Sequence, residues 1–597
     1  MPVTAWMASR LRGDAPTASP SDSANSIAPA REFLGVHWSI ILVLAAFFAV
    51  AFWVPVMTPV ATTDDWGYSR SVEILIDEGH LEVFPVVAAT AVFQIVWGSL
   101  FALVIDNTLG AVRLSTLAIV GVSGAALYDI CRRIGVPVSR AALAVAAYLF
   151  NPLSFVLSYS FMTDPHFAAM MIIATALTLR GIEPGEHPRV RWLIAGSVAA
   201  AAAILIRQQG VLIPLSVAVF LALRGDIQRS RDGFRHLCVV GLIPAMTTLL
   251  YLMWLRWFNG VPDVQSEFAS EIGDAGIGGS LRLISTLTYF ELMYAGFFVL
   301  PITAAALIGF PPLRRRIKGY AWLLAIGWAI AAFAGLVYFA DTNRRMPYVP
   351  QFMGSGGLGP PDVRGSRPRL FEQPFFDLLT ALSFISVMLL GFVLARGLSE
   401  RPAGVRNGAG LVVAVLAGQI VGVIPPSYHY LNRGYSLDRY LLPILPLIIA
   451  LALWALRDSR FVLCIGWAMV ALFGLFAAAG TRDYLHYMDA TWSVAAYAIE
   501  SGARPDQVDA GAAWVGYHLY TYGVDENIDR ARTRDGPWWT YFYGKATDSS
   551  YVVAGRWIRG YVLVTAVPYP SLLQSERTVL LLLRRPEAPW PPEPANE

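Results

Sequence analysis

The chain has 597 residues, of which 56% are hydrophobic and only 15% are charged, and its mean hydropathy is +0.52. A soluble domain usually carries about 25% charged residues, so this composition excludes a soluble enzyme and indicates a membrane protein. The net charge of +3 is small and the basic residues are dispersed along the chain, which argues against nucleic acid as a partner.

Residues 1–36 are polar and rich in Ser, Pro and Ala, and we expect them to form a disordered cytoplasmic tail. The uncharged run "HWSIILVLAAFFAVAFWVPVM" follows at residues 37–57. Because the polar lead is too long for a cleaved signal peptide, this run is predicted to remain as the first membrane helix.

Further uncharged stretches of about 17 to 22 residues recur along the chain, each long enough to cross roughly 30 Å of hydrocarbon. They predict about 13 membrane helices, with an uncertainty of one from the short run at residues 85–105. The predicted spans are 37–57, 110–130, 139–158, 165–180, 190–206, 210–223, 237–257, 286–308, 320–340, 377–396, 409–424, 439–456 and 460–480. Loops rich in arginine alternate with loops that are not, which predicts a cytoplasmic N-terminus and an extracytoplasmic C-terminus.

Three long loops, at residues 58–108, 258–285 and 341–376, are predicted to lie outside the membrane, and the last is rich in Gly and Pro without an apolar period. Beyond residue 480 the hydropathy falls. A helix that Gly502 closes precedes three β-like runs, "SSYVVAG", "GYVLVTAVPY" and "TVLLLLRR". The predicted fold is therefore an all-α polytopic membrane domain at residues 37–480, followed by an extracytoplasmic α/β domain at residues 481–597.

Two adjacent carboxylates, Asp64 and Asp65, stand in "TTDDWGY" where the first helix leaves the membrane. One interpretation is structural, because Thr62, Thr63 or Asp64 can cap the amphipathic helix that follows. The alternative is a functional site, since the chain places a second acidic motif on the same side of the membrane.

That second motif is "SYSFMTDPHF", in which Asp164 and His166 fall between two short apolar runs. Asp164 before Pro165 is also a good helix start. However, two acidic helix starts facing one outer cavity exceed what capping requires, and ionisable groups at membrane depth indicate function by default.

Basic groups complete this set. Arg207 in "ILIRQQG" and Arg439 in "SLDRYLLPILPL" are predicted at outer helix ends. A snorkelling arginine at a lipid headgroup is the competing interpretation. Carboxylates together with guanidinium groups at a membrane surface suit a reaction on a lipid-linked phosphate, because arginine binds phosphate through paired hydrogen bonds and a carboxylate accepts a hydroxyl proton.

The order of "DDWGY", "FMTDP", "IRQQG" and "DRYLLPILP" after an uncharged first helix resembles the glycosyltransferase-C superfamily over about residues 37–480. Within it, the chain looks most like the protein mannosyltransferase and lipid A aminoarabinose transferase branch and related bacterial proteins. This resemblance implies a multi-pass protein of the inner or plasma membrane with its active site and C-terminal domain facing the extracytoplasmic side.

The resemblance implies transfer of a sugar, usually with inversion, from a polyprenyl-phosphate donor to a hydroxyl of a cell-envelope glycan, lipid or protein, with membrane lipids around the enzyme. Asp64 matches the position taken as the general base. The family commonly has Asp-Glu at this pair, so Asp65 departs from it. The other implied site residues are the acidic Asp164, the phosphate-binding Arg207 and Arg439, and the substrate contacts Tyr68, His166, Gln208, Asp438 and Tyr440.

No cofactor is implied with certainty. A divalent metal bridging Asp64 or Asp65 to the phosphate remains open, although no His/Asp cluster with a recognisable spacing argues for one. An oligosaccharyltransferase is a further alternative, but "PWWTYFYG" has Thr540 where the "WWDYG" signature has Asp. A secondary transporter or flippase would place charges in mid-helix and show repeated halves, and a membrane scaffold needs neither acidic loop.

Overall fold

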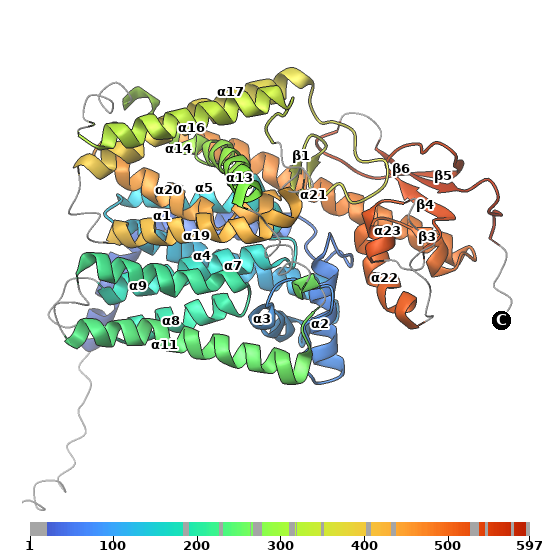
Figure 1. Cartoon of the computed structure of the whole chain (residues 1–597), viewed down its shortest axis with the longest axis horizontal. Helices are drawn as coiled ribbons and strands as arrows, with labels where there is room; N and C mark the ends of the chain where they lie inside the picture. The colour runs from blue at the N-terminus through green and yellow to red at the C-terminus, as the bar shows by residue number, and fades with distance from the viewer. Residues whose placement is uncertain are drawn as a thin grey trace, which may run out of the picture.

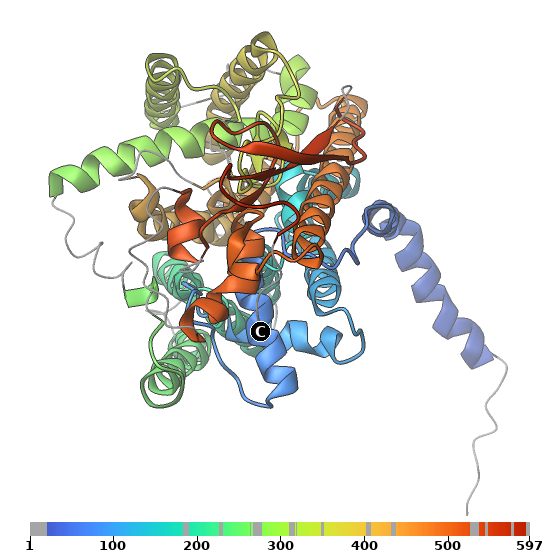
Figure 2. The same cartoon turned by 90° about the vertical axis from the view of Figure 1, so that its right-hand side faces the viewer.

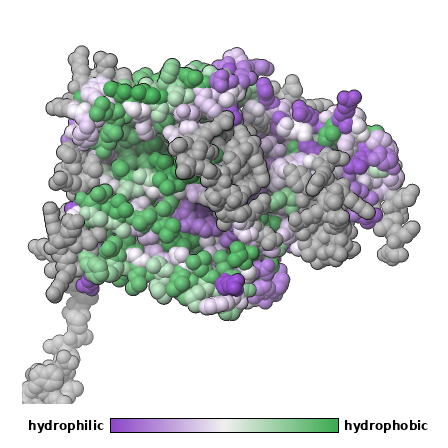
Figure 3. Space-filling model, in the orientation of Figure 1, coloured by the Kyte–Doolittle hydropathy of each residue, from purple (hydrophilic) through white to green (hydrophobic). Residues whose placement is uncertain are grey.

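The protein consists of a bundle of apolar helices with a smaller α/β unit at one end of it (Figure 1). The computed structural model describes residues 21–182, 190–225, 231–262, 264–266, 277–309, 317, 319–347, 351–400, 408–431, 437–525, 536–543, 547–574 and 578–592. Hydrophobic side chains cover much of the visible surface of the bundle, whereas hydrophilic ones gather over the α/β unit (Figure 3). This division matches a membrane domain joined to a water-exposed domain.

Within the described ranges, eight helical segments are long and apolar enough to cross a membrane. They are α4 (Thr108–Arg133), α7 (Thr163–Ile182), Phe234–Asn259 within α11 (Arg231–Trp254) and η2 (Leu255–Asn259), α16 (Ala321–Asp341), α17 (Gln373–Glu400), Gly408–Ser427 of α19 (Gly408–Leu431), η4 (Asp438–Leu441) with α20 (Ile444–Leu456), and α21 (Leu463–Glu500). A ninth is formed if α13 (Ile277–Phe298) and α14 (Leu300–Ala306) with η3 (Leu307–Gly309), bent by 63°, make one span. The predicted multi-pass, mainly helical architecture is confirmed.

The remaining apolar helices are shorter: the apolar part of α1 (Ser21–Trp53), α3 (Val92–Ala102), α5 (Val138–Leu149), α8 (Val190–Ile204), and η1 (Gln208–Val211) with α9 (Leu212–Arg224). At 1.5 Å per residue, a helix such as α5 is only about 18 Å long, less than the hydrocarbon thickness. The count of 13 spans and the orientation across the membrane therefore stay predictions. The uncertain run at 85–105 forms the 11-residue helix α3.

Two predicted boundaries are wrong. Residues 21–36, expected within a disordered tail, belong to α1, because extending an existing helix fixes only one residue per added hydrogen bond. Residues 1–20 lie outside the described part. The helix expected at 139–158 is divided into α5 and α6 (Pro152–Leu157), where Asn151 caps α6 by accepting a hydrogen bond of 3.1 Å from the Leu153 amide. The turn after α6 leads directly to the acidic start of α7.

The C-terminal unit contains a four-stranded sheet in the order β3-β4-β6-β5. Its strands are β3 (Val508–Asp509), β4 (Tyr551–Ala554), β5 (Val562–Pro568) and β6 (Val579–Arg584), so the three predicted β-runs are confirmed. β3 pairs in parallel with β4, and the other pairs are antiparallel. Helices α22 (Ala512–Asp525) and α23 (Trp538–Phe542) belong to this unit. When the molecule is viewed from the end that carries the C-terminal unit, the sheet lies in front of the end of the bundle (Figure 2).

One continuous helix, α21, joins the bundle to the sheet. Its 38 residues replace the separate membrane helix and domain helix that the sequence suggested, and it ends before Gly502, whose φ of +110° suits only glycine. The loop at 341–376 contains a short hairpin, β1 (Met353–Gly354) and β2 (Gly357–Leu358), although its sequence shows no apolar period. The hairpin packs against α21 through β2, and α21 also contacts β6 of the sheet.

Candidate active site

Four charged side chains from four separate segments meet at the end of the bundle that faces the C-terminal unit. Arg207 forms an ion pair with Asp164. The Arg439 guanidinium lies 3.7 Å from Asp164 Oδ2 and 3.4 Å from Asp64 Oδ2. The structure therefore brings two of the acidic residues singled out from the sequence, Asp64 and Asp164, together with both basic residues, and the formal charges of these four cancel. We call these four residues the charged cluster.

Arg207 owes its position to a break between two helices. It has extended backbone angles, φ −144° and ψ 140°, between α8 and η1. The turn depends on Gly210, because a Cβ there would lie 2.6 Å from the Ile204 amide nitrogen and 2.7 Å from the Ala203 carbonyl carbon. A glycine is thus required for close backbone approach, and the turn directs Arg207 inward instead of toward lipid.

Asp164 lies in the first turn of α7 and is almost fully buried, with 1% of its side chain exposed. One oxygen engages Arg207. The other, Oδ2, is buried and accepts no hydrogen bond within the described part of the chain. A buried carboxylate between two guanidinium groups holds both arginines in place, so its position suits orientation of the arginines better than contact with a sugar hydroxyl.

Arg439 lies in the 3-10 turn η4, next to Asp438 and Tyr440. The Asp438 carboxylate accepts hydrogen bonds from the backbone amides of Phe352 (3.1 Å) and Met353 (2.8 Å). Asp438 was predicted as a substrate contact, but its carboxylate instead binds the loop before α17 to the turn that carries Arg439. It is a positioning residue in this arrangement.

The adjacent carboxylates Asp64 and Asp65 have different environments. Asp65 is buried and accepts hydrogen bonds from the Thr62 amide (2.8 Å), the Thr62 hydroxyl (2.7 Å) and the Thr63 amide (2.9 Å). Asp64 is 29% exposed and makes no capping hydrogen bond with its side chain, although it occupies the N-cap position of α2 (Asp65–Asp77). The capping interpretation is thus wrong for the Asp64 side chain. The Asp65 carboxylate is already occupied by hydrogen bonds from Thr62 and Thr63, which argues against a catalytic role for it.

Arg113 on α4 fixes the segment that precedes the acidic pair. This buried guanidinium donates to four backbone carbonyls: Tyr159 (3.1 Å), Val56 (3.2 Å), Thr58 (2.5 Å) and Val60. Charge-assisted hydrogen bonds of this kind are strong, so Arg113 anchors the path of residues 56–60. Sequence reasoning missed it because an arginine near a helix end resembles any other snorkelling arginine.

Tyr543 from the C-terminal unit also reaches the site. Its hydroxyl donates a 2.9 Å hydrogen bond to Asp64 Oδ1, and its ring lies edge-on to Trp66 at a centroid distance of 5.1 Å. Trp66 also approaches Gly516 of α22, where a Cβ would lie 2.3 Å from its indole ring. The "DDWGY" motif therefore docks the C-terminal unit through Trp66 and presents Asp64 to it, a contact that no local sequence signal indicates.

A further carboxylate, Asp362, comes from the Gly/Pro-rich loop. Its Oδ2 accepts a 3.4 Å hydrogen bond from the Thr63 hydroxyl. Burial of Asp362, together with the charge of Asp64, raises the pKa of Asp362 to about 7. The residue keeps some surface exposure, so it can exchange a proton with water near neutral pH. No motif or periodicity distinguishes this residue within its loop, and sequence reasoning missed it.

The remaining predicted substrate contacts fall into two groups. Tyr68 and Tyr440 lie beside the charged cluster. The Arg207 guanidinium lies 5.0 Å from the Tyr440 ring centre, and Tyr68 is close enough to feel the charges of all four cluster residues. Burial raises the pKa of the Tyr68 phenol to about 12, against the effect of the cluster arginines, so Tyr68 stays a hydrogen-bond donor.

His166 and Gln208 are held by backbone carbonyls outside the cluster. His166 is buried in α7, where its Nδ1 donates to the Met162 carbonyl at 3.1 Å. Gln208 is exposed and donates to the Ala88 carbonyl at 2.9 Å. These contacts explain their positions structurally, and nothing in the geometry favours a substrate role for either.

Across the described ranges, no group of three or more His, Cys, Asp or Glu side chains is arranged to hold a metal ion. The two candidates for bridging a metal to phosphate are both engaged. Asp65 accepts protein hydrogen bonds, and Asp64 contacts Arg439 and Tyr543. Direct binding of a divalent ion at this pair would require those contacts to break, so the donor set fits a guanidinium-based phosphate site better.

Residues 95–254 match the model of the family described as dolichyl-phosphate-mannose-protein mannosyltransferase. This range contains both "FMTDP" and "IRQQG", so the resemblance inferred from motif order is confirmed over this part of the chain. A comparison with curated proteins finds no match.

Among solved structures, the chain resembles ArnT from Cupriavidus metallidurans bound to undecaprenyl phosphate, with 15% identity, a TM-score of 0.41 and coverage of 91% of this chain and 97% of ArnT. It also resembles the oligosaccharyltransferase of Archaeoglobus fulgidus tethered to an acceptor peptide, with 13% identity, a TM-score of 0.38 and coverage of 80% and 58%. Arabinosyltransferase EmbB from Mycobacterium smegmatis matches with 15% identity, a TM-score of 0.30 and coverage of 81% and 42%.

Proposed function

We propose that the protein is an integral membrane glycosyltransferase that moves a sugar from a polyprenyl-phosphate donor to an acceptor hydroxyl, with inversion at the anomeric carbon. The observation that carries this proposal is the charged cluster, in which two arginines and two aspartates from distant segments meet beside Tyr543. The family match over residues 95–254 supports the donor class, since that family's description names a sugar carried on a polyprenyl phosphate.

Arg207 and Arg439 suit the phosphate of such a donor. Both are nearly buried, with 10% and 7% of their side chains exposed, so their attraction for an anion is screened less than that of a surface arginine. Their planar guanidinium groups match phosphate oxygens in pairs. Asp164 lies between them and fixes their spacing before the donor arrives, which reduces the reorganisation needed in the transition state.

Asp64 is proposed as the general base. The acceptor oxygen attacks the anomeric carbon while the bond from that carbon to the phosphate oxygen breaks, and the electron pair leaves with the polyprenyl phosphate. The proton of the attacking hydroxyl passes to Asp64, which has the most exposed carboxylate of the cluster. Attack on the side opposite to the phosphate inverts the anomeric configuration.

The charges of the charged cluster suit this order of bond breaking and proton transfer. The donor phosphodiester carries one negative charge, and its departure as a monoester adds a second. Asp64 becomes neutral when it takes the proton, so Arg439, which it shares with Asp164, is released toward the growing charge on the leaving group. The cluster thus exchanges an internal ion pair for contact with the leaving phosphate, and the site keeps the same total charge.

The proposed topology places the charged cluster and residues 481–597 on the extracytoplasmic side of the inner or plasma membrane. This orientation rests on the alternation of arginine-rich loops along residues 37–480. In this arrangement a membrane-bound donor would reach the cluster from the lipid, and an envelope glycan, lipid or protein acceptor would reach it from the aqueous side.

The decisive experiment measures sugar transfer from a polyprenyl-phosphate donor by Asp64→Asn. Asn preserves the size of the side chain and can still meet Tyr543, but it cannot accept the proton, so turnover is expected to fall by about 10² to 10⁴. Asp77→Asn is the matched control, since Asp77 is exposed at the far end of the same helix. Wild-type turnover by folded Asp64→Asn would contradict the proposed base.

A second measurement addresses the phosphate site. Arg439→Lys keeps the positive charge but loses the paired hydrogen bonds, so binding of a polyprenyl-phosphate analogue should weaken. Unchanged analogue binding in both Arg207→Ala and Arg439→Ala would reject this assignment. Solute transport by the reconstituted protein without any glycosyl product would favour the secondary transporter or flippase instead.

A further inference from the structure

A second candidate site lies in a cavity of about 530 Å³ between residues 361–366 of the loop before α17 and the C-terminal unit. This volume is within the usual range for a small-molecule pocket. Its lining includes Arg364 and Ser366 from the loop, Trp539 from α23, and Arg556, Trp557 and Ile558 from the segment after β4. None of these residues belongs to the charged cluster.

A single buried carboxylate, that of Asp509, joins the loop side of the cavity to the side formed by α23. Asp509 of β3 accepts a 2.6 Å hydrogen bond from Arg364 Nε and a 2.9 Å hydrogen bond from Trp539 Nε1. The loop is also joined to the end of β4, because the Gly555 amide donates to the Arg364 carbonyl at 2.9 Å. The cavity is therefore formed before any ligand binds, which lowers the entropy cost of binding.

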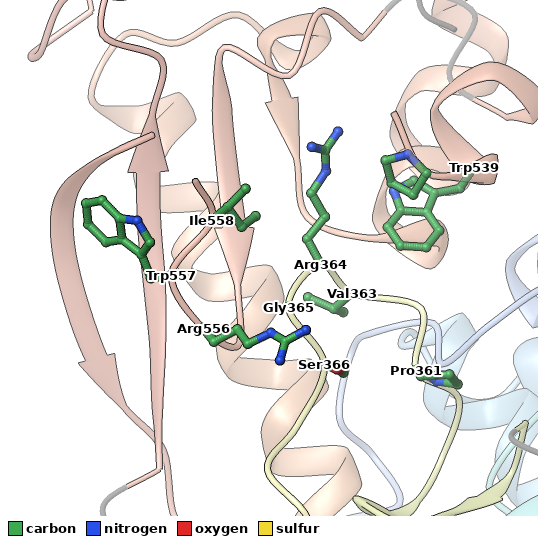
Figure 4. A pocket seen from close by; sticks show the side chains of 10 residues that line it. Pro361, Val363, Arg364, Gly365, Ser366, Trp539, Arg556, Trp557 and Ile558 are labelled. Atoms are coloured by element: carbon green, nitrogen blue, oxygen red, sulfur yellow. The ribbon is translucent and has the colours of Figure 1, made fainter. Parts of the chain in front are cut away.

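The chemistry of the lining combines positive charge with aromatic surface. Arg556 is exposed and forms no ion pair within the described residues, and Figure 4 shows its side chain directed toward Ser366. Trp557 is 57% exposed, so its indole offers an accessible apolar face at the cavity. Trp539 and Trp557 lie on opposite sides of the cavity (Figure 4).

This combination fits a sugar ring that carries a negative group. The C–H face of a pyranose packs against an indole, while a guanidinium binds a carboxylate or a phosphate through paired hydrogen bonds. Arg364 is already neutralised by Asp509, so Arg556 supplies the positive charge available to a ligand. Among the described residues that line the cavity, none is acidic, so the lining does not repel an anion.

Two segments connect the cavity with the proposed base. Trp539 lines the cavity, and the Tyr543 amide donates to the Trp539 carbonyl at 2.9 Å one turn later, where the Tyr543 hydroxyl meets Asp64. On the loop, Pro361 lines the cavity and the next residue, Asp362, contacts Thr63 beside Asp64. Both segments that line the cavity therefore continue directly to residues that contact Asp64 or its neighbour Thr63, so a glycan bound in the cavity would lie near the proposed base.

We propose that this cavity binds an acidic sugar unit, bearing a carboxylate or a phosphate, of the acceptor glycan. The inference rests on the proposed transferase function, because it assigns the cavity to the acceptor. It gives the C-terminal unit a defined role, in which the unit recognises the acceptor's charge and directs a neighbouring hydroxyl toward Asp64.

The test measures binding without turnover, by saturation-transfer NMR on the full-length protein in nanodiscs without donor. The probes are glucuronate, glucose 6-phosphate and neutral glucose. We expect both anionic sugars to bind and glucose to bind at least about tenfold more weakly. We also expect Arg556→Gln to weaken the anionic probes by about tenfold or more, the usual effect of losing a charged hydrogen-bond donor.

Arg559→Gln is the matched control, because Arg559 is exposed three residues away and does not line the cavity. Trp557→Ala should weaken all three probes, since it removes the stacking surface and leaves Arg556 in place. Equal binding of glucose and glucuronate, or equal losses in Arg556→Gln and Arg559→Gln, would overturn the inference. A preference for only one of the two anionic probes would identify which acidic group the cavity recognises and would support it.

These results are separable from a failure of the proposed function. If Asp64→Asn retains full turnover while Arg556→Gln loses anionic sugar binding, the base assignment is wrong and the cavity assignment stands. If turnover falls in Asp64→Asn while no anionic sugar binds the wild-type protein, the reverse holds.

Discussion

Replacing Asp164 by Asn tests whether this residue mainly holds the two arginines. In the wild-type protein its oxygens face Arg207 and Arg439, and only 1% of the side chain is exposed. Asn preserves the shape of the side chain but removes its charge. Arg207 would then lose its ion-pair partner, whereas Arg439 would keep its contact with Asp64, which is 29% exposed and 3.4 Å away.

The magnitude follows from this burial. Removing one member of a buried ion pair costs about 3–5 kcal/mol, because the other charge stays desolvated. Arg207 and Arg439 retain some exposure, so the lower end, about 3 kcal/mol, is expected for Asp164→Asn. For Asp64→Asn, the more exposed and looser pair predicts a loss of about 1 kcal/mol or less.

The assay is unfolding of the purified protein in detergent, followed by helical content as denaturant increases. A double variant, Asp164→Asn with Arg207→Gln, should recover part of the lost stability, because it removes the arginine that lacks a partner. Equal stability losses for Asp164→Asn and Asp64→Asn would refute the positioning role. So would a double variant that is less stable than Asp164→Asn alone.

Three other outcomes are expected. Tyr543→Phe keeps the ring against Trp66 but loses the hydrogen bond to Asp64, so turnover should fall by about tenfold with folding intact; an unchanged rate would show that the contact is dispensable. Gly516→Ala places a methyl group against Trp66 and should destabilise docking of the C-terminal unit by about 1–3 kcal/mol, seen as faster proteolysis of that unit; wild-type resistance would contradict the packing. The raised pKa of Asp362 means that the folded state retains its proton after the unfolded chain has released it, so its stability contribution is present below about pH 4 and is lost as pH rises to about 7. Asp362→Asn should remove this part of the pH dependence in unfolding experiments from about pH 4 to 8, and identical profiles would reject the shift.

The helical architecture was predictable because membrane helices have a simple physical signature. Uncharged runs of sufficient length indicated where most helices lie, and β-branched runs indicated the three long strands of the C-terminal unit. Helix breaks were harder to predict. The division at Asn151 and Pro152 occurs inside an apolar run, so hydropathy alone could not separate α5 from α6.

Within the candidate site, residues at helix ends were predictable and contacts between distant segments were not. Asp164 was predictable because an ionisable group at membrane depth indicates function, and Arg207 and Arg439 because guanidinium groups near carboxylates suit a lipid-linked phosphate. The difference between Asp64 and Asp65 depends on side-chain direction, which adjacency in sequence cannot show. Contacts between remote segments also leave no local pattern, as Tyr543 illustrates: it lies 479 residues from its partner Asp64.

The continuity of α21 has a geometric consequence for the proposed transfer reaction. At 1.5 Å per residue, its 38 residues span about 57 Å, of which about 30 Å can lie in hydrocarbon. The rest forms a continuous helical strut, which in the proposed orientation would hold the sheet at a fixed height above the lipid. Under the proposed function, an acceptor would therefore have to present its hydroxyl within a narrow layer above the bilayer. Lengthening the strut by one helical turn, about 5.4 Å, would lift the sheet away from Asp64 while leaving both parts intact.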